Sequence, residues 1–258
     1  MNRLGAAIEN LNAPDWLTAR PIAHRGLHSE ARGLVENTRS AAEAAIAKSY
    51  AIECDIQLAG DGEAVVFHDF TLDRLTFGQG RVDSFSAREL GAFAFKGCAD
   101  RIAPLSAFLA AIGGRTPLII EIKSRFDGDF RLPGRALETI ASYRGPVALK
   151  SFDPLVLTFL RAQKPFCPIG LVAEARYEAE EWPELGGDQR IALATLRDFA
   201  SMRPDFLSWR VGDLPHATPE LCRSGIGMPV MTWTVRSAAD RLAAARWADQ
   251  MIFEGFEP

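Results

Sequence analysis

The fold class of this chain is decided by YAIECDIQL at residues 50–58 and PLIIEIK at residues 117–123. Each is a short, nearly continuous run of apolar residues that is rich in isoleucine. Such runs are typical of strands that are covered on both faces, as in a parallel sheet. Further runs predict strands in the same way at residues 21–26, 146–152, 168–174, 206–211, 229–235 and 250–256.

Helical patterns separate most of these eight runs. At residues 38–47, alanines alternate with charged residues, which fits an amphipathic helix with a small-residue packing face. Eight strands with helices between them favour a closed (β/α)8 TIM barrel, which uses roughly 250 residues as one domain. An open doubly wound sheet is the alternative, because the sequence does not show closure. We expect helices at residues 36–48, 104–112, 131–143, 154–163 and 237–247.

Residues 70–102 break the strand–helix rhythm. This segment contains Gly78, Gly80 and Gly97, and it is long for a connection between barrel elements. We expect it to form a small insertion after the second strand, over one end of the barrel. No repeat or linker indicates a second domain, so residues 1–258 are predicted to form a single catalytic domain.

Composition limits the classes of partner. The 258 residues include 29 Lys and Arg against 33 Asp and Glu, so the net charge of −4 argues against nucleic acid and anionic membranes as partners. No run reaches the 18 or so apolar residues of a membrane span, and residues 1–20 lack the apolar core of a secretory signal. The four cysteines show no CxxC spacing and are expected to be reduced thiols. We therefore expect a cytoplasmic location; the oligomeric state has no signature.

Three carboxylates follow the strongest predicted strands. Glu53 and Asp55 are two residues apart in one strand, so both side chains point to the same face. Glu121 and Lys123 repeat this spacing in the next strong strand. A converging all-oxygen ligand set favours Mg²⁺ or Ca²⁺, or else Mn²⁺, over zinc. The alternative is a set of structural ion pairs, with Glu121 bound to Lys123 or Arg25.

Two of the four histidines end apolar strands beside charged residues. His24 precedes Arg25, and His68 precedes Asp69. Imidazoles in such places can transfer protons near neutral pH, one as base and one as acid. The alternative is a hydrogen-bonded structural histidine. His28, in a polar stretch, and His216, which follows Pro215, are expected to be ordinary histidines.

The ordered set of motifs along the chain resembles the glycerophosphodiester phosphodiesterases. The likeness covers nearly the whole sequence, and its strength comes from the order of the motifs rather than from any one of them. The motifs are His24-Arg25-Gly26, Glu36-Asn37-Thr38, Glu53-Cys54-Asp55, Val65-Val66-Phe67-His68-Asp69, Leu72-Asp73-Arg74-Leu75-Thr76, Glu121-Ile122-Lys123, Ser151-Phe152 and Trp233-Thr234-Val235.

The resemblance implies a TIM-barrel hydrolase with a divalent metal that converts glycerophosphodiesters to sn-glycerol 3-phosphate and an alcohol. It implies that His24 and His68 are the general acid and base. The implied metal ligands are Glu53, Asp55 and Glu121. The implied substrate contacts are Arg25 and Lys123, which would bind phosphate, and Trp233, which would form a wall of the substrate cleft.

The sequence departs from the family pattern near its end. The family often closes its last strand with Thr-Asp-x-Pro, whereas residues 253–258 read FEGFEP, and Arg236 replaces the asparagine commonly found after Trp-Thr-Val. These changes affect the expected substrate more than the expected reaction. Two alternatives follow: a hydrolase of lysophospholipids or other phosphodiesters on the same barrel, and a non-catalytic protein that binds phosphorylated glycerol compounds.

Overall fold

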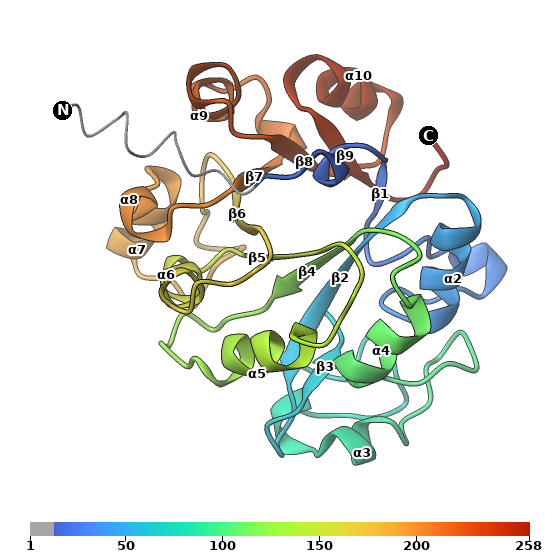
Figure 1. The fold of residues 1–258 in the computed structure, drawn as a ribbon. Helices are drawn as coiled ribbons and strands as arrows, with labels where there is room; N and C mark the ends of the chain where they lie inside the picture. The colour runs from blue at the N-terminus through green and yellow to red at the C-terminus, as the bar shows by residue number, and fades with distance from the viewer. Residues whose placement is uncertain (1–12) are drawn as a thin grey trace. The chain divides into compact units, whose positions relative to one another are not determined.

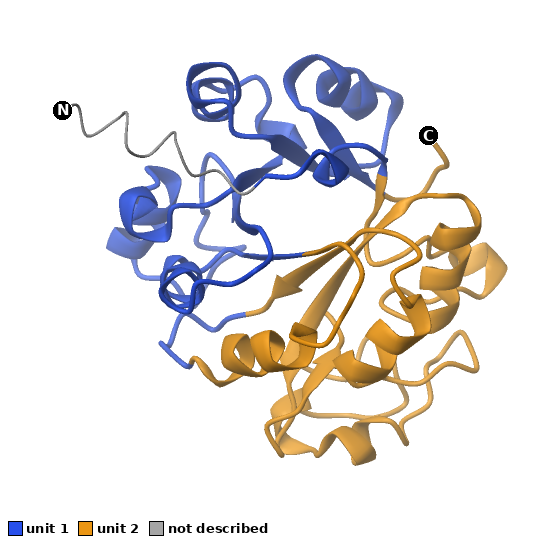
Figure 2. Ribbon diagram, in the orientation of Figure 1, with its two compact units in different colours: residues 1–21, 124–129, 148–253 blue, residues 22–123, 130–147, 254–258 orange. Residues whose placement is uncertain are grey.

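A computed structural model describes residues 13–258, which divide into two compact units (Figure 2). Residues 13–21, 124–129 and 148–253 make up unit 1, and residues 22–123, 130–147 and 254–258 make up unit 2. The expected lack of a secretory signal at residues 1–20 falls largely outside the described residues. The expectation of a single domain stays a prediction.

Unit 2 is built around strand β2, whose eight residues carry most of the unit's strand pairing (Figure 1). β2 pairs in parallel with β1 and with β4, and its last three residues pair with β3 in antiparallel orientation. All residues of β2 except Leu58 are buried, as the continuous apolar run predicts. The strands are β1 Ile22–Ala23, β2 Ala51–Leu58, β3 Ala64–Val66 and β4 Leu118–Ile122.

Helices follow the strands of unit 2. Thr38 caps α2, Arg39–Ala47, by accepting a hydrogen bond from the Ala41 amide, and the buried face of this helix consists of Ala41, Ala42 and Ala45. This is the small-residue packing face that the sequence predicted. Two further helices are α4 Leu105–Ile112 and α5 Arg131–Ile140, and a short 3-10 helix lies at Glu30–Arg32.

The segment between β3 and α4 is mostly irregular. It holds only a 3-10 turn at Val82–Ser84 and the four-residue helix α3, Ala87–Leu90. Its apolar side chains, including Leu72, Leu90 and Phe95, pack into a small cluster together with β3. The segment is therefore held by its own small core rather than by regular secondary structure.

Unit 1 contains a parallel sheet in the chain order β5-β6-β7-β8-β9. Every residue of β6 is buried, and so are all residues of β7 except Arg210. The strands are β5 Val147–Ser151, β6 Ile169–Ala173, β7 Phe206–Arg210, β8 Val230–Val235 and β9 Gln250–Phe253. The helices are α6 Pro154–Ala162, α7 Gly187–Ala194, α8 Phe199–Met202, α9 Ala217–Glu220 and α10 Ala238–Trp247, with 3-10 turns at Asp15–Leu17 and Val211–Asp213 and a π-helical turn at Leu221–Gly225.

Each of the eight predicted strands corresponds to an observed strand, and each of the five predicted helices to an observed helix. Helices α7 and α8 were not predicted. The cysteines are free thiols, and Cys98 alone among them is not buried. Among the described residues, none of the helices combines the length and the apolar character needed to span a membrane.

Candidate active site

A tight turn after β1 brings His24 and Arg25 beside β2. Arg25 and Gly26 adopt positive φ angles of 55° and 79°. A Cβ atom at Gly26 would lie 2.9 Å from the backbone and Cβ of Ala41 in α2, so only glycine fits here. The turn is fixed to β2 because the Gly26 amide donates to the Glu53 carbonyl at 3.2 Å and the Arg25 amide to Glu53 Oε2 at 3.1 Å.

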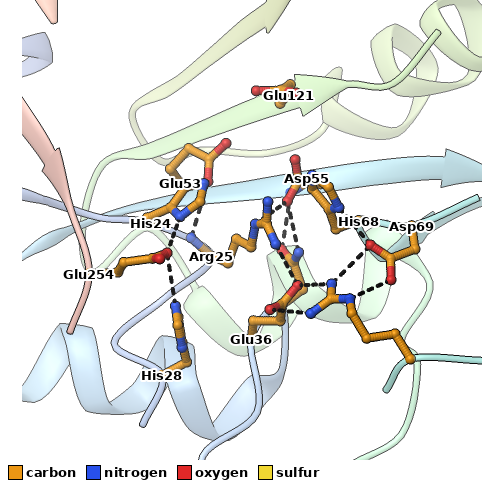
Figure 3. A network of polar contacts seen from close by, with 12 residues as sticks. His24, Arg25, His28, Glu36, Glu53, Asp55, His68, Asp69, Glu121 and Glu254 are labelled. Atoms are coloured by element: carbon orange, nitrogen blue, oxygen red, sulfur yellow. Dashed lines mark hydrogen bonds and ion pairs between the residues drawn. The ribbon is translucent and has the colours of Figure 1, made fainter. Parts of the chain in front are cut away.

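Three buried carboxylates meet at β2 and β4 (Figure 3). Glu53 and Asp55 alternate along β2 on one face, and Glu121 lies directly opposite Asp55 in the parallel register. Each of the three offers an oxygen within 4.8 Å of the others. Their exposed fractions are 0%, 1% and 5%. The structure thus brings together the three acidic residues that the sequence singled out.

Two cations bind these carboxylates. Lys123 Nζ lies 2.9 Å from Asp55 Oδ1 and 2.5 Å from Glu121 Oε1, and Arg25 Nε lies 3.3 Å from Asp55 Oδ2. Burial alone would raise the pKa of Asp55; the positive charge of Lys123, with further contributions from the two histidines and Arg25, holds this pKa well below its usual range. Burial likewise opposes the charge of Lys123, but Asp55 and Glu121 raise its pKa above the usual value.

The net charge of this cluster is compatible with a bound divalent cation. The three carboxylates exceed the two cations by one negative charge, and Arg25 also binds Glu36 Oε1 at 2.7 Å. Buried like charges are costly unless they are compensated. An oxygen-only donor set within this distance suits Mg²⁺, Ca²⁺ or Mn²⁺. The residues present therefore fit a divalent metal, whose identity they leave open.

Asn37 holds Asp55 in place. Its amide nitrogen donates to Asp55 Oδ2 at 2.9 Å, and its Oδ1 accepts the Asp55 backbone amide at 3.0 Å. Asn37 is buried and has a φ of 58°, and its own amide donates to the Arg25 carbonyl. The sequence analysis quoted Glu36-Asn37-Thr38 only as a motif and assigned it no role, so this positioning function was missed.

His68 follows β3, and hydrogen bonds orient both its ring and its backbone carbonyl. Its Nδ1 lies 2.8 Å from Asp69 Oδ1, and its carbonyl accepts a hydrogen bond from Gln57, on the same face of β2 as Asp55. Arg74 joins Asp69 to Glu36 through four hydrogen bonds of 2.6 to 3.0 Å. Burial opposes the charge of Asp69, but His68 and Arg74 lower its pKa well below the usual value.

His24 is held by a residue from the far end of the chain. Its Nδ1 lies 2.5 Å from Glu254 Oε2, while its Nε2 lies 4.0 Å from Glu53 Oε2. His28 Nε2 lies 3.4 Å from the same Glu254 oxygen (Figure 3). The sequence places Glu254 only in a tail that departs from the family pattern, and it predicts His28 to be an ordinary histidine. Both lie in the cluster, and the 230 positions between His24 and Glu254 explain why no local pattern could reveal it.

The chain is similar to known phosphodiesterases. A sequence model of the glycerophosphoryl diester phosphodiesterase family matches residues 24–111. A glycerophosphodiester phosphodiesterase from Caldanaerobacter subterraneus subsp. tengcongensis is 34% identical over 164 residues, 58% of this chain and 65% of that protein. One from Bacillus subtilis is 25% identical over 271 residues, 96% of this chain and 86% of that protein.

Residues 24–111 of the chain are therefore similar to the glycerophosphoryl diester phosphodiesterase family. The chain matches slightly less than two thirds of the length of the Caldanaerobacter relative. Its fold matches that of a phosphodiesterase from Oleispira antarctica, solved in complex with the product sn-glycerol-3-phosphate, with a TM-score of 0.73 and 20% identity over 90% of this chain and 91% of that chain. The predicted (β/α)8 TIM-barrel class is confirmed by this likeness.

The segment matched by the family model holds most of the predicted site. It includes His24, Arg25, Glu53, Asp55 and His68. The predicted site residues beyond it are Glu121, Lys123 and Trp233.

Trp233 belongs to β8 in unit 1. Its ring nitrogen donates to the Ser208 carbonyl at 3.0 Å, and its ring meets Phe152 edge to face with centroids 5.4 Å apart. Phe152 also contacts Trp182, so Trp233 is part of an aromatic cluster within unit 1. The role of Trp233 as a wall of the substrate cleft stays a prediction.

Proposed function

We propose that this chain hydrolyses glycerophosphodiesters to sn-glycerol 3-phosphate and an alcohol, at the cluster of Glu53, Asp55 and Glu121. The observation that carries the proposal is the meeting of three buried carboxylates with two oriented histidines in one unit. A protein that only binds phosphorylated glycerol needs no acid–base pair, which argues against the non-catalytic alternative. The similarity to this family supports the substrate class.

The histidines are prepared for proton transfer. An ionised carboxylate only accepts hydrogen bonds, so Glu254 and Asp69 fix the proton of His24 and of His68 on Nδ1. One ring acts in its neutral form and takes a proton on Nε2 from an attacking hydroxyl group. The other ring starts as the imidazolium and gives its Nε2 proton to the leaving alkoxide, and proton exchange with solvent then restores both rings. Each such step is worth about 10²–10⁴-fold in rate.

The charged residues would bind the phosphodiester anion. A divalent cation held by Glu53, Asp55 and Glu121 would stabilise negative charge on the phosphoryl oxygens in the transition state. Arg25 and Lys123 already lie against Asp55 and supply N–H donors to the same place. With a divalent cation held by the three carboxylates, Arg25 and Lys123 would have N–H groups available to bind phosphate oxygens.

The insertion favours a water-soluble diester over a lysophospholipid. Of its phenylalanines, Phe95 is buried, and Phe85 and Phe93 pack against the same apolar cluster. Phe77, 72% exposed, is the one large apolar side chain of this segment that lies open to water. A single exposed ring offers little surface to an acyl chain. We therefore expect glycerophosphocholine or glycerophosphoethanolamine to be preferred.

The experiment is an assay of glycerol 3-phosphate release from glycerophosphocholine, with lysophosphatidylcholine in parallel. We expect activity that EDTA abolishes and that Mg²⁺, Ca²⁺ or Mn²⁺ restores. His24→Ala should lose the activity, while His216→Ala, at a histidine of unit 1 that caps α9, should keep it. Release that ignores both EDTA and His24→Ala would overturn the proposal.

A further inference from the structure

The cluster of His24, His28 and Glu254 has the composition of a transition-metal site. Each residue offers one ligand atom, and these atoms lie within 4.8 Å of one another. Both imidazoles direct a ring nitrogen at the same carboxylate oxygen, at 2.5 and 3.4 Å. Two histidines and one glutamate form a ligand set that proteins use for zinc with one coordination position left open.

We propose that His24, His28 and Glu254 form a second metal site, selective for Zn²⁺ and similar nitrogen-preferring ions. Zinc ligands lie about 2.0–2.2 Å from the metal, so tetrahedral donors are roughly 3.4 Å apart. The distance from His28 to Glu254 already has this value. The shorter contact from His24 has to open by under an ångström, which a small rotation of the Glu254 carboxylate supplies.

The surroundings of His24 support metal binding. A histidine that binds a metal through one ring nitrogen commonly donates its other N–H to a carboxylate. With the metal on Nδ1 of His24, the remaining N–H lies on Nε2 and faces Glu53 Oε2, 4.0 Å away. The side chains of His28 and Glu254 are 22% and 18% exposed, so an ion can enter from solvent.

The two metal sites differ in ligand chemistry. The three buried carboxylates offer only hard oxygen donors, whereas this cluster adds two imidazoles, which suit zinc, copper and nickel. Excess Mg²⁺ therefore fills the first site and leaves the second for Zn²⁺. A metal on Nδ1 keeps the remaining proton on Nε2, so His24 loses its free lone pair. Zinc binding would then inhibit the hydrolysis, a consequence that rests on the proposed function.

The test is calorimetric titration of the whole chain with Zn²⁺ in excess Mg²⁺, comparing the unmodified protein with His28→Gln. His28→Gln removes one ligand and leaves His24 and Glu254 in the chain, and His216→Gln is the matched control. We expect His28→Gln to lower the zinc affinity by at least about tenfold. His216→Gln should retain it, and Co²⁺ should give the visible absorption of a nitrogen-ligated ion only where His28 is present. Equal zinc affinity in the unmodified protein and His28→Gln would overturn the proposal.

The inhibition is measured separately. The rate of each protein is compared with its own rate without zinc, and His28→Gln should need at least about tenfold more Zn²⁺ for half inhibition. If no variant shows activity, the proposed function fails while the calorimetry still decides the zinc site. If the enzyme is active and zinc binds through His28 without inhibiting, the link between the site and His24 is wrong.

Discussion

Two groups of candidate metal ligands lie near His24 in unit 2, and they differ in burial and in donor chemistry. Glu53, Asp55 and Glu121 are buried on regular strands and are surrounded by Lys123 and Arg25. His24, His28 and Glu254 lie outside the strands; His24 is buried, whereas His28 and Glu254 are partly open to solvent. The strands hold the first group rigidly, and its three carboxylates carry more negative charge than the two cations neutralise. The second group is looser and adds nitrogen donors, so neighbouring sites on one scaffold can select different ions.

A large loss of activity is expected from a substitution in the buried group of carboxylates. Glu121→Gln removes one oxygen ligand and one of the two carboxylates that bind Lys123. Loss of several kcal/mol of electrostatic stabilisation corresponds to a rate about 10³-fold lower. The rate of glycerophosphocholine hydrolysis at saturating Mg²⁺ measures this loss. Glu138→Gln, at an exposed position of α5, is the control, and an active Glu121→Gln would show that this carboxylate is not a metal ligand.

The contact between the two groups is probed at His24 and Glu254. His24→Ala should lower the rate by about 10²–10⁴-fold if the ring transfers a proton. Glu254→Gln keeps the His24 ring but replaces the carboxylate with an amide, whose N–H group can face Nδ1. This change should lower the rate by about 10–100-fold. Steady-state kinetics should place most of both losses in kcat. An unchanged kcat in Glu254→Gln would mean that the carboxylate does not orient His24.

The stability of the buried group should depend on Asp55. Because nearby cations lower the pKa of this carboxylate, its charge is favourable in the folded protein. Asp55→Asn leaves Lys123 and Arg25 with one buried partner fewer and should lower the free energy of unfolding by about 3 kcal/mol. Urea denaturation measures this change. Asp188→Asn, at an exposed position, should change stability by under about 0.5 kcal/mol, and equal effects at the two positions would contradict the account.

A smaller effect is expected in the network that holds His68. Burial raises the pKa of Glu36, but Arg74 and Arg25 lower it below its usual value. The pKa of Asp69 is lowered as well. Both carboxylates are therefore more acidic in the folded chain than unfolded. Their stabilisation is present above the unfolded pKa of about 4 and is lost as pH falls towards the folded values.

Arg74→Ala tests this network. Because Arg74 is half exposed, its removal should cost only about 1 kcal/mol at neutral pH, and the difference from the unmodified protein should shrink as the pH falls below about 4. Urea denaturation at several pH values measures it, with Arg81→Ala as a control at another arginine of the same segment. A difference that grows in acid would contradict the sign of the argument.

The sequence predicted the buried group because strand alternation is a local signal. Glu53 and Asp55 had to share a face of β2, and the repeated spacing in Glu121 and Lys123 placed a second strand beside it. The eight strands were found for the same reason. Helix α7 was missed because its residues 187–194 lie in a polar stretch with little apolar periodicity.

The second group could not be predicted, because it depends on contacts between distant parts of the chain. Glu254 meets His24 and His28 across more than 220 positions, and its neighbours in sequence give no sign of that contact. The role of Asn37 depends on a positive φ and on a strand that lies 18 positions away. Such residues are recognised only when the fold has placed their partners.

The central claim is that one divalent cation binds the three buried carboxylates. Calorimetric titration of the metal-free chain with Mn²⁺, in parallel with Glu121→Gln, tests it most directly. The account predicts one Mn²⁺ per chain at this site, and a loss of this binding in Glu121→Gln while His28→Gln retains it. If the unmodified chain binds no Mn²⁺, or Glu121→Gln binds it as tightly, the carboxylates are structural ion pairs and the account is wrong.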